Sequence, residues 1–196
     1  TGATGATGAI GPVGPTGLTG ATGPAGPQGL PGTGLVTNGS TTLGGVQALL
    51  SPTSLYNTAI GYYAMSANTT GYYNSAIGTQ AMWLNASGNY NVALGSNVLS
   101  SNTTGNANTG VGVGSLGANT SGYNNVALGN GALQSVTTGA QNIGIGLGSG
   151  GALTSELNNI DIGNVAVVGD SGVIRIGAAP AQSSVYIAGI GGRDLS

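Results

Sequence analysis

The stretch NTAIGYYAMSANTTGYY, residues 57–73, opens a series of consecutive seventeen-residue repeats that runs to residue 158. The six copies begin at Asn57, Asn74, Asn91, Asn108, Asn125 and Asn142, and each of these asparagines is position 1 of its copy. A period of this length is too short for a pair of helices and fits one coil of a solenoid, in which stacked neighbours bury a common core.

Two adjacent positions of the repeat have opposite size preferences. Position 3 is always Ala or Gly and position 4 is always aliphatic, as in a short strand whose side chains alternate between its two faces. We expect position 4 to stack into the core, with position 3 letting another backbone approach. The residues at position 4 are Ile60, Ile77, Leu94, Val111, Leu128 and Ile145.

Further positions suggest a second strand and two turns. Position 9 is apolar and predicts a second core column, carried by a second strand. Its residues are Met65, Met82, Leu99, Leu116 and Leu133. Glycine at positions 5 and 15 predicts tight turns with positive φ.

Residues 1–34 have a different period. Glycine occupies every third position from Gly2 to Gly32, and Gly34 breaks the frame. Only glycine fits where three polyproline-II chains meet, so this segment predicts a collagen triple helix and therefore three chains. A flexible linker is the alternative. Residues 35–56 are interpreted as a transition with a degenerate first coil.

Threonine fills the third place of several collagen triplets. These threonines either carry O-linked sugar or are simply tolerated there. They are Thr4, Thr7, Thr16, Thr19 and Thr22. The segment resembles the threonine-rich collagen-like stalks of bacterial, spore-surface and phage proteins, some of which are glycosylated at threonine.

The composition argues against catalysis and against nucleic-acid binding. Charged residues make up only 3% of the 196 residues, and there is no histidine, cysteine or lysine. Two arginines cannot neutralise a nucleic-acid backbone, and acid–base or nucleophilic schemes lack their usual groups. We predict no enzyme activity, no cofactor, no metal and no membrane insertion. Near neutrality instead favours association with other copies.

The C-terminal region, residues 159–196, is predicted to hold shortened coils and a cap. The repeat is reduced to NIDIG (159–163), VIRIG (173–177) and VYIAG (185–189). All the charged side chains of the sequence fall at or beyond Glu156. Glu156, Asp161 and Asp170 are interpreted as solvated cap residues. The alternative is Ca²⁺ binding or glycoside cleavage by Glu156 with Asp161, or by Asp161 with Asp170.

The repeat pattern NxAIGxxAMxxNTTG resembles the head repeats of trimeric autotransporter adhesins over about residues 40–177. The resemblance implies a trimeric, left-handed parallel β-roll, although the present repeat is three residues longer. Residues 173–192 also resemble the segment that precedes the self-cleaving chaperone of phage tail fibres. Ser196 is then either a self-cleavage end or an arbitrary boundary.

Two groups of residues are candidate binding or modification sites. Aromatic residues gather in the first three repeats and form either a contact surface, for a surface glycan or a neighbouring trimer, or a local structural belt. They are Tyr62, Tyr63, Tyr72, Tyr73, Trp83 and Tyr90. Four Asn-x-Ser/Thr asparagines predict either a buried amide ladder or N-glycosylation. They are Asn68, Asn85, Asn102 and Asn119.

Together these features predict a fibrous homotrimer: a collagen triple helix followed by a trimeric parallel β-roll or β-solenoid of seventeen-residue coils. The expected function is that of a non-enzymatic structural subunit of an extracellular fibre or filament on a cell or spore surface. End-to-end assembly is an additional possibility. The alternative is a receptor- or glycan-binding adhesin or phage tail fibre on a virion surface.

Overall fold

The computed structural model describes residues 1–5, 8, 36–37, 42–50, 55–178, 182 and 184. Residues 1–5 and 8 are exposed and have no regular secondary structure. Most of the predicted collagen segment, residues 1–34, lies outside the described residues, as does the predicted VYIAG strand at 185–189.

Within the described residues, ten short strands form one sheet in chain order. They are β1 (Val36–Thr37), β2 (Thr42–Gly44), β3 (Thr58–Ile60), β4 (Ser75–Ile77), β5 (Val92–Leu94), β6 (Thr109–Val111), β7 (Val126–Leu128), β8 (Ile143–Ile145), β9 (Ile160–Ile162) and β10 (Ile174–Ile176). β1 pairs antiparallel with β2, and every later pair is parallel.

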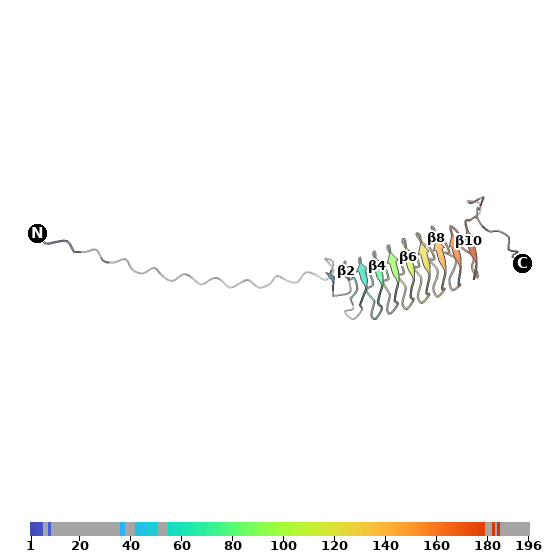
Figure 1. Ribbon diagram of the computed structural model, residues 1–196, viewed down its shortest axis with the longest axis horizontal. Coiled ribbons are helices and arrows are strands. Elements are labelled where there is room, and N and C mark those ends of the chain that lie inside the picture. Colours follow the sequence, from blue (N-terminus) through green and yellow to red (C-terminus); the bar gives the residue numbers. More distant parts are fainter. Residues whose placement is uncertain are drawn as a thin grey trace, which may run out of the picture.

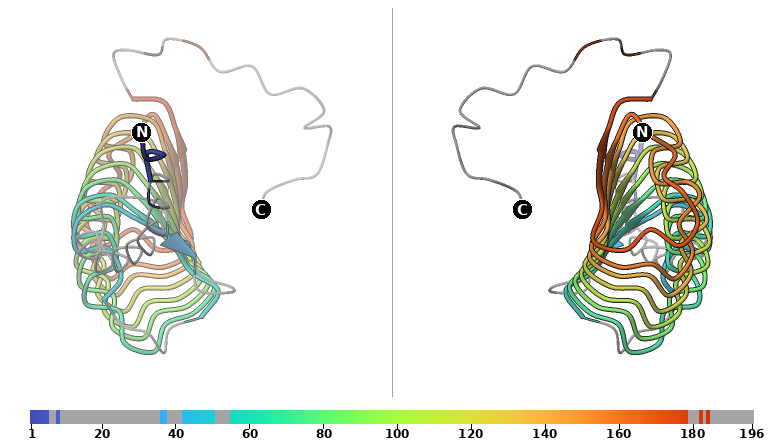
Figure 2. Two further views of the ribbon diagram at one scale, coloured as in Figure 1. Left: turned by 90° about the vertical axis from the view of Figure 1, so that its left-hand side faces the viewer. Right: turned by 90° about the vertical axis from the view of Figure 1, so that its right-hand side faces the viewer.

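The molecule is a parallel β-solenoid, as the repeat predicted. Strands β3 to β9 recur every seventeen residues, and equivalent positions pair directly, as Ala76 does with Ala93. Figure 1 shows the strands following one another along the long axis of the stack. Viewed end on, successive coils superimpose as flattened loops (Figure 2). The described residues contain no helix, and hence none that is long and apolar enough to cross a membrane.

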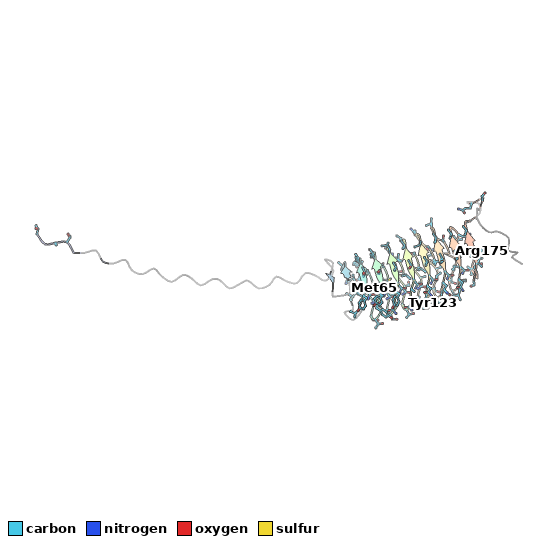
Figure 3. The ribbon with its side chains drawn as sticks, viewed as in Figure 1. Met65, Tyr123 and Arg175 are labelled. Carbon is cyan, nitrogen blue, oxygen red and sulfur yellow. The ribbon has the colours of Figure 1, made fainter. Side chains whose placement is uncertain are left out.

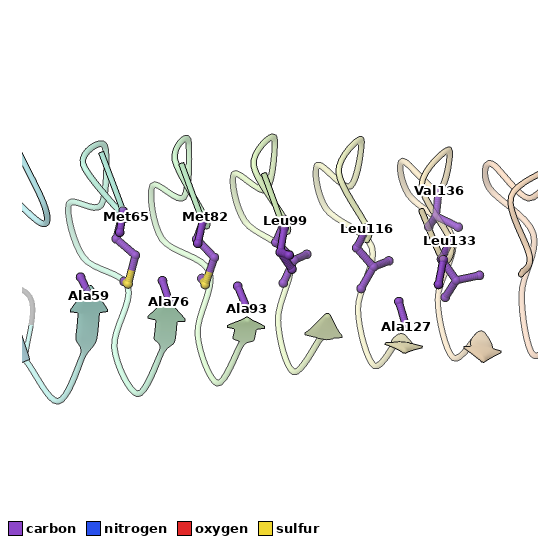
Figure 4. Close-up of a cluster of buried hydrophobic side chains, with 14 of the residues drawn as sticks. Ala59, Met65, Ala76, Met82, Ala93, Leu99, Leu116, Ala127, Leu133 and Val136 are labelled. Atoms are coloured by element: carbon purple, nitrogen blue, oxygen red, sulfur yellow. The ribbon is translucent and has the colours of Figure 1, made fainter. Parts of the chain in front are cut away.

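The core lies between the strand and the opposite side of each coil. Position 3 points inward in β3 to β9, and Ala59, Ala76 and Ala93 are at most 1% exposed. These alanines face the buried column at position 9, which includes Met65 and Leu116 (Figure 4). Large side chains on one side therefore pack against very small ones on the other, which keeps the coil flat.

The prediction that position 4 forms the core is wrong for the single chain. Ile60 is 36% exposed and Leu94 is 46% exposed, because positions 2 and 4 lie on the outer face of the strand. The interior is too shallow for them. A Cβ added at Gly110, in position 3, would lie 2.5 Å from Val98 Cγ1. In this coil even a methyl group at position 3 would require Val98 to move, which shows how shallow the interior is.

The predicted second strand is also absent from the described coils. Position 9 has φ near +50°, for example 51° at Met65 and 50° at Leu133, which is incompatible with a strand. This side is nevertheless hydrogen-bonded between coils. The amide of Met82 donates to Val98 O at 2.9 Å, and that of Leu99 donates to Ser115 O at 3.1 Å. The second side is a stack of turns that places one large side chain inward per coil.

The two glycine columns have different causes. At position 5 the prediction of positive φ is correct: Gly129 has φ +136°, and an added Cβ would lie 2.5 Å from Gly146 O. At position 15 φ is not positive, and the requirement is steric. A Cβ at Gly88 would lie 2.5 Å from Asn85 Oδ1 and 2.6 Å from Asn102 Nδ2. Position 15 is therefore glycine because the carbonyl of the next coil, here Gly105 O, and a buried row of asparagines both lie against it.

The last coil of the stack is shorter than the others. Ile174 of β10 pairs with Ile160 of β9, fourteen residues earlier. In the same pair of strands Arg175 lies opposite Asp161, so the inward position that holds alanine or glycine in earlier coils becomes charged here. The apolar interior therefore ends at β9.

Candidate functional site

The most extensive unusual surface is the outer side of the sheet, formed by positions 2 and 4 of β3 to β10, here called the strand face. Every residue at position 4 and its counterpart in the later strands is aliphatic, and the outer positions carry no charge. At about 4.8 Å per coil, eight strands give a flat strip roughly 35 Å long. Monomeric proteins rarely expose an apolar patch of this extent.

The strand face becomes more apolar toward the C-terminal end. In β3 and β4 position 2 is Thr58 and Ser75, whereas in β8 and β9 it is Ile143 and Ile160. In β10 both outer residues are isoleucine, and Ile174 is 65% exposed. A hollow of ≈ 280 Å³ continues the surface at this end. It is lined by Ile162, Gly163, Ile176, Gly177, Gln182 and Ser184.

The aromatic candidates do not form a single surface. Tyr73 stacks on Tyr90 with ring centroids 5.3 Å apart, and Tyr72 contacts both edge on. Sequence reasoning omitted Tyr56, which stacks on the other face of Tyr73 at 4.9 Å. The signal was available, because Tyr56 precedes Tyr73 by one repeat.

The other aromatic candidates lie outside this group. Tyr62 and Tyr63 form a separate perpendicular pair with centroids 4.4 Å apart. The hydrogen bond with Tyr63 and desolvation raise the pKa of Tyr62. Trp83 is partly exposed and makes no ring contact within the described part of the chain.

The four sequon asparagines are buried inside the coil and form a ladder. Asn85 Nδ2 donates to Asn68 Oδ1, Asn102 Nδ2 to Asn85 Oδ1, and Asn119 Nδ2 to Asn102 Oδ1, each at 2.7 Å. The amides also donate to glycine carbonyls at position 15, such as Gly105 O at 3.0 Å from Asn102. This geometry agrees with the amide-ladder interpretation and leaves these nitrogens inaccessible to a glycosylating enzyme in the folded coil.

A second asparagine ladder, at position 1, was missed by sequence reasoning. Asn91 Nδ2 donates to Asn74 Oδ1 at 3.2 Å and to Gly105 O at 2.8 Å, and its backbone amide donates to Asn74 Oδ1 at 2.9 Å. The signal in the sequence was the asparagine that begins every copy. Together the two ladders satisfy backbone groups at the corner where the chain enters each strand.

Charged side chains gather at the C-terminal end of the stack, where Figure 3 places Arg175. Arg175 Nε donates to Asp170 Oδ2 at 2.6 Å and Nη2 donates to Oδ1 at 3.0 Å. This hydrogen-bonded pair lowers the pKa of Asp170 and raises that of Arg175. Asp161, only 1% exposed, leaves Oδ2 without a hydrogen bond. Burial and the charge of Asp170 raise the pKa of Asp161.

Glu156 folds back onto the chain in the same region. Its carboxylate accepts hydrogen bonds from the amides of Thr154, Ser155 and Gly169, the last at 2.9 Å. Burial opposes ionisation, but these amides together lower the pKa of Glu156 to about 2. Asp170 and Glu156 thus act as partnered cap residues, whereas Asp161 is a buried one, contrary to its interpretation as solvated.

None of the described residues belongs to a cluster of three or more acidic, histidine or cysteine side chains that could hold a metal. Of the candidate O-glycosylation threonines, Thr4 is described and exposed, whereas Thr7, Thr16, Thr19 and Thr22 lie outside the described residues. No protein family, curated protein or solved structure matches the chain.

Proposed function

We propose that the chain is a non-enzymatic structural subunit of a homotrimeric extracellular fibre. The strand face is the observation that carries this proposal. It is a long, flat, uncharged strip of aliphatic side chains, and water contact with such a surface is unfavourable by roughly 25 cal/mol per Å². Covering it with other copies of the same chain removes that cost in every subunit at once.

The collagen period supplies the number of copies. Eleven glycines spaced by three, from Gly2 to Gly32, fit a structure in which three parallel chains share an axis. Three solenoids attached to one such rod are held side by side with their axes parallel. Their strand faces then meet around the continuation of the rod axis.

The gradient along the strand face indicates where the contact is strongest. Both outer positions are aliphatic in β7 to β10, whereas hydroxyl side chains alternate with aliphatic ones in β3, β4 and β6. Burial of the C-terminal half therefore contributes most of the association free energy. The predicted collagen rod, which lacks charged pairs, depends on this end to keep its three chains together.

The first test is the mass of the intact chain in solution. Sedimentation equilibrium should give three times the 18.6 kDa chain mass. Leu128→Ser combined with Ile145→Ser removes two aliphatic side chains from the strand face and should shift the population toward monomers. The matched control, Leu84→Ser with Leu147→Ser, removes two exposed leucines from turns and should leave the trimer intact. A monomeric parent chain would refute the proposal.

Imaging distinguishes single trimers from filaments. Cryo-electron microscopy of the purified chain should show threads with a regular repeat if the solenoid end of one trimer contacts the rod of the next. Separate rods with a blunt end, at concentrations where the mass is trimeric, would limit the function to that of a short fibre.

A second candidate, a glycan-binding adhesin, is favoured by the exposed aromatic residues of the first three coils. Sugar rings pack against open aromatic faces. Both faces of Tyr73 are already covered by Tyr56 and Tyr90, so Tyr62 and Trp83 are the better candidates. Binding on a glycan array that is lost in Tyr62→Ala and Trp83→Ala, with the trimer intact, would establish this role.

A further inference from the structure

Four tyrosines form a compact cluster along one corner of the first coils. Tyr56, Tyr73 and Tyr90 occupy position 17 of successive coils, and their rings are nearly parallel, with interplanar angles of 16° for both stacked pairs. Tyr72 packs edge on against Tyr73 and Tyr90, with centroids 5.5 Å away in each case. The side chains are 40–56% exposed, so the cluster is open to small molecules in solution.

The fold does not require aromatic rings at position 17. In later coils this position is Ala107, Asn124, Gln141 and Asn158, with the same left-handed backbone. Tyr56, Tyr73 and Tyr90 have φ of 59°, 55° and 58°, a region that asparagine tolerates better than a bulky side chain. The three tyrosines are therefore kept at a conformational cost in a place where asparagine would serve the backbone better.

The geometry of the cluster is unsuited to sugar stacking but suited to coupling between phenols. Each stacked pair presents one ring face directly to another, at 4.9 Å and 5.3 Å between centroids. Two phenoxyl radicals combine through ring faces, at the carbons next to the oxygen. Parallel rings held against each other bring those carbons together with only a small approach of the two side chains.

We propose that Tyr56, Tyr73 and Tyr90 form an oxidative cross-linking site, at which stacked phenols of successive coils couple into dityrosine. A one-electron oxidant, such as a peroxidase using hydrogen peroxide, removes one electron and one proton from each phenol. The two radicals form a carbon–carbon bond between ortho positions. Each bonded carbon then gives its hydrogen back to its own ring oxygen as a proton, which restores two aromatic phenols. Two tyrosines and one peroxide thus yield one dityrosine and two waters.

The bond would join coils covalently in a chain that has no other means of doing so. The sequence contains no cysteine, so disulfides are excluded. Links from Tyr56 to Tyr73 or from Tyr73 to Tyr90 close loops of seventeen residues and limit the unfolded state, as other cross-links do. They also lie in the first coils, next to the end of the solenoid where unstacking can begin.

The chain contains two internal controls for this geometry. Tyr62 and Tyr63 have closer centroids, 4.4 Å apart, but their rings are perpendicular, at 87°. Tyr123 occupies the same repeat position as Tyr72, is 49% exposed and lies in the middle of the stack (Figure 3). It makes no ring contact within the described residues. If exposure alone decided the reaction, all of these residues would react. If stacking decides it, reaction is confined to Tyr56, Tyr73 and Tyr90.

The test is treatment of the dilute full-length chain with peroxidase and hydrogen peroxide, followed by peptide mapping by tandem mass spectrometry. The expected products are dityrosine fluorescence, loss of two hydrogens per link, and peptides joining Tyr56 to Tyr73 or Tyr73 to Tyr90. The denatured product should keep the 18.6 kDa mass of one chain. Links spread evenly over Tyr62, Tyr63 and Tyr123, links only between chains, or no dityrosine would each overturn the proposal.

Conservative variants sharpen the result. Tyr73→Phe keeps the stacked ring but removes the phenol, so the links from Tyr73 to Tyr56 and to Tyr90 should both be lost. The urea midpoint of the unoxidised protein should stay unchanged. Tyr123→Phe and Tyr63→Phe should react like the parent chain. Retention of the parent yield of dityrosine in Tyr73→Phe would contradict the proposal. Because the mapping of the parent chain is decisive by itself, the test does not depend on the variants folding.

Discussion

The inner and outer sides of the same strand are both apolar, but they differ in the size of the side chain that each accepts. In β7, Ala127 is fully buried and Leu128, the next residue, is 38% exposed. The small residue belongs to the coil's interior and the large one to its surface. Hydrophobicity therefore does not indicate which side is inside, and the size limit set by the opposite column does. The proposed contact between chains would account for the outer leucine.

The largest expected loss of stability comes from adding a methyl group at Gly129, directly after β7, where the next coil leaves no space for it. Gly129→Ala adds a methyl group 2.5 Å from Gly146 O at φ +136°, so strain and overlap should together cost about 4 kcal/mol in unfolding free energy. Gly114→Ala, at φ +69° with nothing within 4 Å of the added Cβ, should cost about 1 kcal/mol. Urea unfolding measures both, and similar losses would contradict the packing argument.

Breaking the buried ladder should have the next largest effect. Asn102→Ala leaves Asn85 Oδ1 without its 2.7 Å donor and Asn119 Nδ2 without its 2.7 Å acceptor, at a cost of about 3 kcal/mol. Asn119 is the last member, since Val136 follows it by one repeat and Asn119 Oδ1 has no partner. Asn119→Ala should therefore destabilise the chain by about half as much. Equal losses by chemical denaturation would contradict the assignment of Asn119 as the end of the ladder.

The inner and outer residues of β7 can be compared directly. Ala127→Leu overfills the interior and should cost about 2 kcal/mol. Leu128→Ala leaves the coil intact and should change the stability of an isolated chain by less than about 1 kcal/mol. Its main effect should instead be weaker association, measured by sedimentation. If Leu128→Ala destabilised a monomeric form more than Ala127→Leu does, the assignment of the two sides would be wrong.

Asp161 places a carboxylate on the inner side of β9, where β3 to β8 carry alanine or glycine. It therefore tests how the interior responds to a charge. Its raised pKa means that the folded state holds the proton more tightly than the unfolded chain. The associated stability is present below the ordinary aspartate pKa and is lost as pH rises through the folded pKa. Asp161→Asn should therefore raise the free energy of unfolding at neutral pH by about 1 kcal/mol, with no gain in acid. A gain that is independent of pH would argue against titration of Asp161.

Removing the charge of Glu156 should change the free energy of unfolding in the opposite direction, by a similar amount. Its pKa of about 2 lies below that of the unfolded chain, so its contribution is present above the ordinary glutamate pKa and is lost as pH falls toward 2. Because the side chain is partly exposed, Glu156→Gln should cost only about 1 kcal/mol at neutral pH. Thermal unfolding of the two proteins should converge at low pH. A constant difference across that range would assign the effect to packing.

Much of the solenoid was predictable from the sequence, but the side each residue faces was not. The seventeen-residue period, a short strand containing positions 3 and 4 and the second apolar column at position 9 all follow from spacing. The ladder that includes Asn91 and the stacking of Tyr56 on Tyr73 were missed. Both depend on side chains seventeen residues apart lying directly above one another, a spacing that the sequence contains although the contacts form only when the coils are stacked.

The sequence by itself determined the repeat unit, the absence of charge before Glu156 and the glycine period of residues 2–32. These are properties of spacing and composition, which constrain any fold the chain adopts. The tertiary structure decided which strand side is the interior, why Gly88 must lack a side chain and where Asp161 is buried. These depend on the shallow gap between the two sides of a coil and on the atoms of the next coil. The position of Gly88 against Asn102, for example, joins two successive coils that no local stretch of sequence contains together.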